Sequence, residues 1–219
     1  MSSAQSTPVA WAVVVPVKRL EVAKTRLSRL AGAQRGALAS AFAVDTVAAA
    51  LQAPGVAWVL VVTDEPEVSR QVRELGAQTV LDVPDAGLNP ALAYGASVVA
   101  RRSPELGVAA LSADLPALRP AELGRALAAA QSHPVSFVSD AEGTGTTLFT
   151  ALPGEPFLPQ FGHRSRAAHR ADGAVEITLD GLPSLHRDVD TEVDLADARR
   201  LGVGPLTAAM LSSLLDGEP

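Results

Sequence analysis

Cysteine is absent from this 219-residue chain, and aromatic residues make up only 4% of it. The missing cysteine excludes disulfides, thiolate metal sites and a cysteine nucleophile, and it fits a reducing compartment. With so few aromatic rings, the core must be built from Ala, Val and Leu. No apolar run approaches membrane-spanning length, and nothing resembles a targeting signal. We therefore expect a cytoplasmic protein.

Positive charge is also scarce. Lys and Arg number 18 against 24 Asp and Glu, a formal net charge of −6, which argues against nucleic acid or a membrane surface as a partner. Hydrophobic residues at 47% and charged residues at 19% indicate a globular chain. The length is typical of one domain. We expect a single domain over residues 1–219, with a flexible N-terminus at residues 1–8.

Strand-like and helix-like segments alternate along the chain. Short β-branched runs predict strands, and longer periodic segments with proline or glycine at their ends predict helices. This alternation predicts a three-layer α/β fold with a mixed, mostly parallel sheet, the hairpin being antiparallel. The predicted strands are residues 11–17, 58–63, 78–81, 108–112, 175–179 and a hairpin of 135–139 with 146–151; the predicted helices are 31–52, 67–75, 90–102, 120–131, 165–172, 192–201 and 205–215.

The segment after the first predicted strand concentrates positive charge. From Lys18 to Arg35 it holds six basic residues and one acidic residue, and it contains the only two lysines of the chain, Lys18 and Lys24. The compact ammonium of lysine can follow a moving phosphate, and loops at the carboxyl ends of strands are where such sheets bind ligands. Residues 18–30 contain no glycine, which argues against a P-loop or a dinucleotide fingerprint.

Carboxylates collect later in the chain. Asp114 directly follows a predicted strand, and Asp188 and Asp190 would project to the same side of an extended segment. Together these three could hold one or two magnesium ions. Asp194 fits a cap or first-turn position of the next helix. A solvated surface remains the alternative for each charged run, and a helix cap or turn is the alternative for Asp114.

Two glycine-containing segments are candidate anion sites. Residues 143–147 read GTGTT, and Gly162 and Ser165 lie in the segment FGHRS, within a basic stretch that holds Arg164, Arg166 and Arg170. Backbone N–H groups and hydroxyls there could bond an anion, while a plain hairpin turn and an N-cap serine are the alternatives. The four histidines show no zinc spacing, and neither a Ser/His/Asp triad nor G-x-S-x-G can be assigned.

A series of segments resembles the guanylyltransferases of coenzyme F-420 biosynthesis, most closely the actinobacterial branch. They are, in order, VPVKRLEVAKTRL, ADLPAL, GTGT, FGHRSRAAHRADGAVE and DVDTEVDLADARRLGVGP, and they cover residues 13–205. The resemblance implies a single-domain, Rossmann-like nucleotidyltransferase fold that transfers GMP from GTP to phosphoenolpyruvate and releases pyrophosphate. It assigns two magnesium ions to Asp114, Asp188 and Asp190, phosphoenolpyruvate to Thr146, Gly162 and Ser165, and the GTP phosphates to the loop from Lys18 to Arg26.

Further hypotheses rest on this resemblance. Lys18 and Lys24 would contact triphosphate oxygens with help from Arg26, and Asn89 would contact the guanine or ribose. The acceptor could instead be 2-phospho-L-lactate or 3-phosphoglycerate, and less readily a sugar phosphate or pterin. A nucleotide-binding module without catalysis is the alternative from another class. Functional coupling to the next transferase of the pathway is also left open, as are the oligomeric state, the order of binding and the basis of guanine preference.

Overall fold

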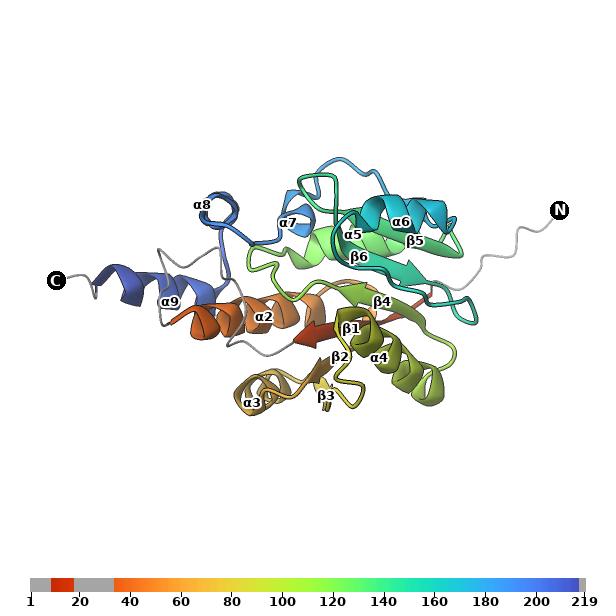
Figure 1. Cartoon of the computed structure of the whole chain (residues 1–219), viewed down its shortest axis with the longest axis horizontal. Helices are drawn as coiled ribbons and strands as arrows, with labels where there is room; N and C mark the ends of the chain where they lie inside the picture. The colour runs from red at the N-terminus through yellow and green to blue at the C-terminus, as the bar shows by residue number, and fades with distance from the viewer. Residues whose placement is uncertain (1–8, 18–33, 217–219) are drawn as a thin grey trace.

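The computed structural model describes residues 9–17 and 34–216, whose strands form one seven-stranded sheet in the order β3-β2-β1-β4-β6-β5-β7 (Figure 1). The strands are β1 (Trp11–Val17), β2 (Val56–Thr63), β3 (Gln78–Val80), β4 (Gly107–Leu111), β5 (Val135–Ser139), β6 (Thr146–Ala151) and β7 (Val175–Glu176). Strand β6 is antiparallel to both of its neighbours, β4 and β5, and the other pairs are parallel. The predicted mixed, mostly parallel sheet is confirmed.

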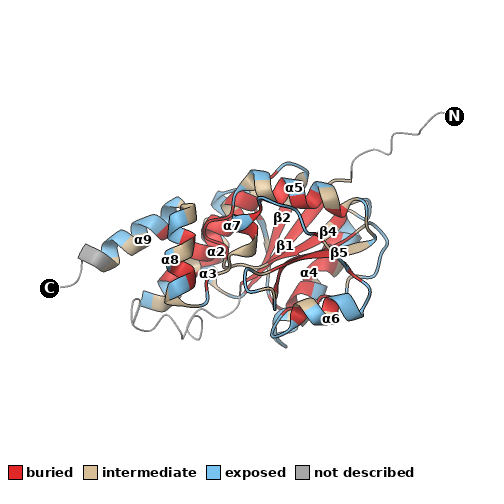
Figure 2. Cartoon of the chain, turned by 90° about the horizontal axis from the view of Figure 1, so that it is seen from above, coloured by how far each residue is buried: buried red, intermediate tan, exposed pale blue. Residues whose placement is uncertain are grey.

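Helices cover both faces of the sheet (Figure 2). They are α2 (Arg35–Leu51), α3 (Pro66–Glu74), α4 (Leu88–Arg102), α5 (Pro120–Ala130), α6 (Ser165–Ala171), α7 (Pro183–His186), α8 (Glu192–Leu201) and α9 (Pro205–Asp216). Figure 2 shows α5 and α7 on one side of the strands and α4 and α6 on the other. The predicted three-layer α/β class is therefore also confirmed.

The side chains of β1 alternate between two cores. Trp11, Val13 and Val15 pack in the cluster under α2, α3 and α5, whereas Ala12 and Val14 face the cluster under α4. Since every residue of β1 is buried, the strand shows a continuous apolar run and no alternation of polar and apolar residues. The run of valines therefore places β1 at the centre of the sheet.

The predicted elements differ from the structure mainly at short segments. The predicted strand at 175–179 ends at Glu176, and the single-turn helix α7 was not predicted because four residues carry no readable periodicity. The predicted helix at 31–52 is observed from Arg35, and residues 31–33 lie outside the described ranges. Within those ranges no helix has the length and apolarity that crossing a membrane requires.

Helix α9 is hydrogen-bonded to α2 through a buried carboxylate. The side chain of Asp45, on α2, accepts hydrogen bonds from the backbone N–H groups of Leu206 (3.2 Å) and Thr207 (2.8 Å). Gly204 N–H also donates to Pro116 C=O at 2.8 Å, in the segment that follows β4. The first turn of α9 is thus capped by another helix.

Candidate functional site

One edge of the sheet gathers most of the predicted site residues. The carboxyl ends of the parallel strands β1 to β4 lie there, and because β6 runs the opposite way, its first residue, Thr146, lies there too. Strand β1 has β2 on one side and β4 on the other, so the connections leaving β1 and β4 diverge at this point. Such a switch point is where open α/β sheets bind ligands.

The segment carrying Asp114 is held from α2 by Thr46. The Thr46 hydroxyl is fully buried and accepts a hydrogen bond from Leu115 N–H at 3.1 Å, while its one proton is shared between Phe42 C=O at 2.8 Å and Ala113 C=O at 3.3 Å. It thereby anchors the backbone directly after Asp114. Sequence reasoning missed Thr46, since nothing marks a mid-helix threonine whose partners lie almost seventy residues away.

The segment that carries Asp188 and Asp190 is hydrogen-bonded to the segment that carries Asp114. Val189 N–H donates to Asp114 C=O at 3.0 Å, and the Val189 side chain is fully buried. On either side of it Asp188 is half-buried and Asp190 is exposed. The structure therefore brings the three predicted carboxylates onto two adjoining segments. The predicted projection of the two carboxylates to the same side stays a prediction.

The residues around this pair have structural partners. Asp194 and Thr191 form a reciprocal capping box at the start of α8, which confirms the predicted cap. Asp194 also pairs with Arg187 (3.0 Å).

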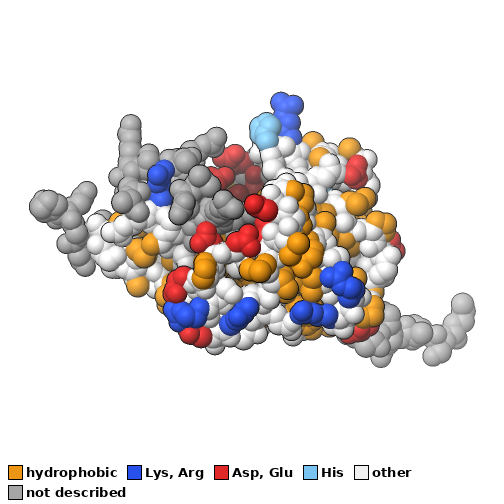
Figure 3. All heavy atoms as spheres, turned by 60° about the horizontal axis from the view of Figure 1, so that its bottom comes forward, with side chains coloured by type: hydrophobic (Ala, Val, Ile, Leu, Met, Phe, Trp, Pro, Cys, Tyr) orange, Lys and Arg blue, Asp and Glu red, His pale blue; other side chains and the backbone are white. Residues whose placement is uncertain are grey.

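A different group of three carboxylates, Asp64, Asp82 and Asp85, lies after β2 and β3. Among the described residues, these are the three whose ligand oxygens all lie within 4.8 Å of one another. Figure 3, which brings the α3 and β3 side forward, shows acidic side chains gathered near the middle of that face.

Thr146 and Ser165 form a buried pair of hydroxyls. Ser165 Oγ donates to Thr146 Oγ1 at 3.0 Å, and both residues are at least nine-tenths buried. Thr146 Oγ1 also lies 3.0 Å from Nδ1 of His169, and the backbone N–H of Gln160 donates to the other ring nitrogen, Nε2, at 2.9 Å. The two predicted acceptor residues are therefore joined in one hydrogen-bonded group.

His169 is the least basic member of the basic stretch. Its ring stacks on Phe149 (centroids 4.6 Å apart) and contacts Phe137 and Phe161. Burial lowers the pKa of His169 to about 4, and the nearby Asp172 acts weakly in the opposite direction. The ring is therefore neutral at neutral pH. Its sequence neighbours gave no sign of burial, which comes from three separate segments.

Asn89 holds the loop that contains Gly162. Its side-chain amide donates to Phe161 C=O at 3.0 Å, and its side-chain oxygen accepts from Phe161 N–H at 2.8 Å. Gly162 follows with a φ of +126°, which favours glycine, and Arg164 has a φ of +61°. The loop is thus fixed from the start of α4. The predicted contact of Asn89 with the nucleotide stays a prediction.

The remaining charges of the basic stretch are partly neutralised. Arg166 and Arg170 pair with Glu176 of β7 at 2.9 and 2.5 Å. Burial would raise the pKa of Glu176, but the hydrogen bond and charge of Arg166 and the charge of Arg170 hold it below its ordinary value. These two arginines therefore stabilise the structure around α6.

The GTGTT turn is organised by Asp140, which was not singled out from the sequence. Its carboxylate accepts from Thr144 N–H (2.8 Å) and Gly145 N–H (2.7 Å), and a Cβ at Gly145 would clash with it. An aspartate just before a glycine-rich turn is the signal that could have found it. The glycines of the turn thus have a structural reason to be there.

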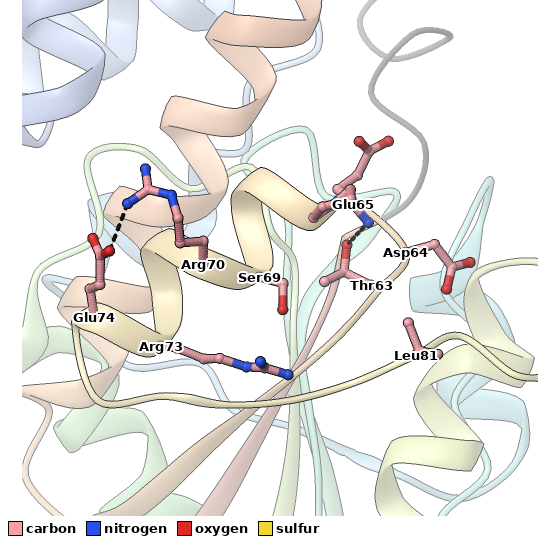
Figure 4. A pocket seen from close by; sticks show the side chains of 9 residues that line it. Thr63, Asp64, Glu65, Ser69, Arg70, Arg73, Glu74 and Leu81 are labelled. Carbon is pink, nitrogen blue, oxygen red and sulfur yellow. Dashed lines mark hydrogen bonds and ion pairs between the residues drawn. The ribbon is translucent and has the colours of Figure 1, made fainter.

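A separate pocket of about 610 Å³ lies between α3 and the end of β3 (Figure 4). Its arginines already have partners: Arg70 pairs with Glu67 and Glu74 at 2.6 Å each, and Arg73 donates to Thr79 at 2.5 Å. A guanidinium that already pairs with two carboxylates, as in Arg70, offers little to a phosphate. The predicted phosphate ligands Lys18, Lys24 and Arg26 lie outside the described residues.

Comparison with known proteins gives consistent matches. Residues 11–173 match the family model described as "Guanylyl transferase CofC like". A phosphoenolpyruvate guanylyltransferase of Thermomonospora curvata is 54% identical over 98% of this chain and 94% of its own length. One of Streptomyces coelicolor is 57% identical over 94% of this chain and 97% of its own. The resemblance stated from the motifs is confirmed.

Solved structures agree on the fold. A protein of Desulfovibrio desulfuricans G20, whose name suggests a nucleotide-diphospho-sugar transferase, has a TM-score of 0.66 at 15% identity, covering 94% of this chain and 96% of its own. A nucleotidyl transferase from Methanothermobacter has a TM-score of 0.59 at 20% identity, covering 89% and 98%. At these identities the likeness shows that the arrangement of strands and helices is shared.

Proposed function

Because the chain belongs to the CofC-like guanylyl transferase family, we propose that it transfers GMP from GTP to phosphoenolpyruvate in coenzyme F-420 biosynthesis. The carrying observation is the convergence, at one sheet edge, of a carboxylate-bearing pair of segments and a buried pair of hydroxyls. The first suits phosphates with their counter-ions, and the second suits an anionic acceptor. The named acceptor of the two close relatives is phosphoenolpyruvate.

The reaction needs little covalent chemistry from the protein. An oxygen of the acceptor phosphate attacks the α-phosphorus of GTP in line; a new P–O bond forms, the bond to the β-phosphate breaks, and pyrophosphate leaves. The attacking phosphate is already anionic, so neither a protein nucleophile nor a strong general base is required. The protein's task is to position two polyanions against their mutual repulsion.

The residues proposed to hold the acceptor and those proposed to hold GTP form two separate groups. Thr146, Ser165 and Gly162 hold the acceptor, with hydroxyl and backbone groups as donors. Lys18 and Lys24 contact the triphosphate oxygens, assisted by Arg26, and offset the charge that develops on the leaving pyrophosphate.

The donor set of Asp114, Asp188 and Asp190 fits a hard divalent cation. Carboxylate oxygens are the ligands that Mg²⁺ takes, and the bond from Val189 N–H to Asp114 C=O sets the two segments side by side. These residues would hold two magnesium ions, which supply positive charge to the phosphates when bound.

The choice of acceptor is decided by assay. 2-Phospho-L-lactate and 3-phosphoglycerate share a carboxylate and a phosphate with phosphoenolpyruvate, so all three fit the same donors. We expect pyrophosphate release from GTP and Mg²⁺ with phosphoenolpyruvate above the other two, best followed with the next transferase of the pathway present to consume a labile product. No release with any acceptor would favour a binding module. A cytoplasmic location and coupling to that transferase belong to the same proposal.

Lys24→Ala tests the triphosphate assignment. Loss of one ammonium contact that acts on the developing charge should lower kcat by about 10²-fold or more. Lys24→Arg keeps the charge but replaces the compact ammonium with a planar fork, so an intermediate rate is expected. Arg101→Ala, on the exposed end of α4, is the matched control. Wild-type turnover in Lys24→Ala would remove the assignment.

A further inference from the structure

The buried imidazole of His169 lies behind the two hydroxyls proposed to hold the acceptor. Its residue is 1% exposed, and each of its two ring nitrogens takes part in one hydrogen bond. One partner is Thr146 Oγ1, and the other is the backbone N–H of Gln160. The direction of each bond follows from what the partners can do.

The Gln160 contact sets the tautomer. A backbone N–H can only donate, so Nε2 of His169 must be the acceptor and carries no proton. The neutral ring then has its proton on Nδ1, and that N–H donates to Thr146 Oγ1 at 3.0 Å. The surrounding phenylalanines keep water away and disfavour a second proton on the ring.

Proton counting then fixes what the hydroxyl pair offers. Thr146 Oγ1 accepts from His169, and a single hydroxyl proton is used in the bond between Thr146 and Ser165. Since the pair has two hydroxyl protons, one remains to be donated to a third group. The opposite tautomer would reverse this result, because Nδ1 would accept the Thr146 proton while Ser165 donated to Thr146. No outward proton would then be left.

We propose that His169 is a positioning residue that sets the hydrogen-bond polarity of Thr146 and Ser165, so that the pair donates to the anionic acceptor. An anion accepts hydrogen bonds and cannot donate them, so only one of the two tautomers suits it. The inference rests on the proposed function in assigning the acceptor to this pair. The polarity of the pair itself rests on the contacts of Gln160, His169 and Thr146.

Two variants separate the two ring nitrogens. In His169→Asn the side-chain amide reaches the Nδ1 position and can still donate to Thr146. In His169→Gln it reaches the Nε2 position, so it can accept from Gln160 but leaves Thr146 without its donor. We expect His169→Gln to raise the KM for phosphoenolpyruvate about 10- to 100-fold, the loss of one hydrogen bond to a charged group, with the KM for GTP unchanged. His169→Asn should retain most of the acceptor affinity, and His133→Gln is the control.

The outcomes divide cleanly. An unchanged acceptor KM in His169→Gln, an equal rise in both variants, or a parallel rise in the KM for GTP would overturn the inference, because each indicates either no role or a packing role. If neither variant folds, ¹H–¹⁵N spectra of histidine-labelled wild-type protein decide it. A proton on Nδ1 of His169 supports the inference, and a proton on Nε2 refutes it. Wild-type protein that releases no pyrophosphate with any acceptor would defeat the proposed function, while the spectra still test the polarity.

Discussion

Replacing Thr46 with valine should weaken both the fold and the site, because its hydroxyl accepts the hydrogen bond of Leu115 N–H, directly after Asp114. Valine has nearly the same shape as threonine, so the change creates no cavity. It leaves Leu115 N–H, which lies in a buried segment, without its 3.1 Å partner. An unsatisfied buried donor costs about 1–3 kcal/mol. For a chain of this size that corresponds to a fall in Tm of roughly 2–12 °C.

The same substitution should act on turnover. Asp114 would lose a fixed backbone anchor, and a small misplacement of a reacting group can lower kcat by up to about 10²-fold. Urea unfolding gives the stability and pyrophosphate release gives the rate, both for Thr46→Val and for Thr46→Ser, which keeps the hydroxyl and loses only a methyl group. Wild-type stability and turnover in Thr46→Val would refute the reasoning. So would an equal loss of turnover in Thr46→Ser, since the hydroxyl would then be irrelevant.

Two further predictions concern the acceptor loop. Asn89→Ala removes both hydrogen-bond partners of the Phe161 backbone and should raise the KM for the acceptor. Asn89→Asp keeps the oxygen that accepts from Phe161 N–H and should raise that KM less. A change confined to the KM for GTP would instead support the nucleotide contact. The pKa of His169 is about 4 in the folded state against 6.5 unfolded, so its contribution to stability is complete above pH 6.5 and is lost, by up to about 3 kcal/mol, as the pH falls toward 4. Urea unfolding across that range should show a smaller fall in His169→Gln, and parallel curves for the two proteins would contradict it.

The fold was largely predictable because its strongest signals are local. The runs of valine mark β1 and β2, which are buried on both faces, and proline and glycine mark the helix ends. Asp114 could be placed at the sheet edge for the same reason, since it comes three residues after the end of β4. The capping role of Asp194 likewise depends on neighbours three residues away.

The parts that could not be predicted depend on contacts between distant segments. Arg166 and Arg170 appear in the sequence as free charge, but Glu176 from a short edge strand pairs with both. His169 appears as a basic surface residue and is enclosed by phenylalanines from β5, β6 and the loop before α6. Such partners come from other elements of the fold, and no periodicity or spacing indicates them.

The antiparallel strand β6 also has a consequence for how the protein becomes active as it folds. The four strands from β3 to β4 can assemble in a run of parallel pairs before β5 and β6 arrive, and the β5–β6 hairpin then joins them through the single pairing of β4 with β6. Thr146 stands on the joining strand, whereas Asp114 follows the strand it joins. The pairing of β4 with β6 is therefore what brings Thr146 to the same sheet edge as Asp114, and activity regained during refolding should report that pairing.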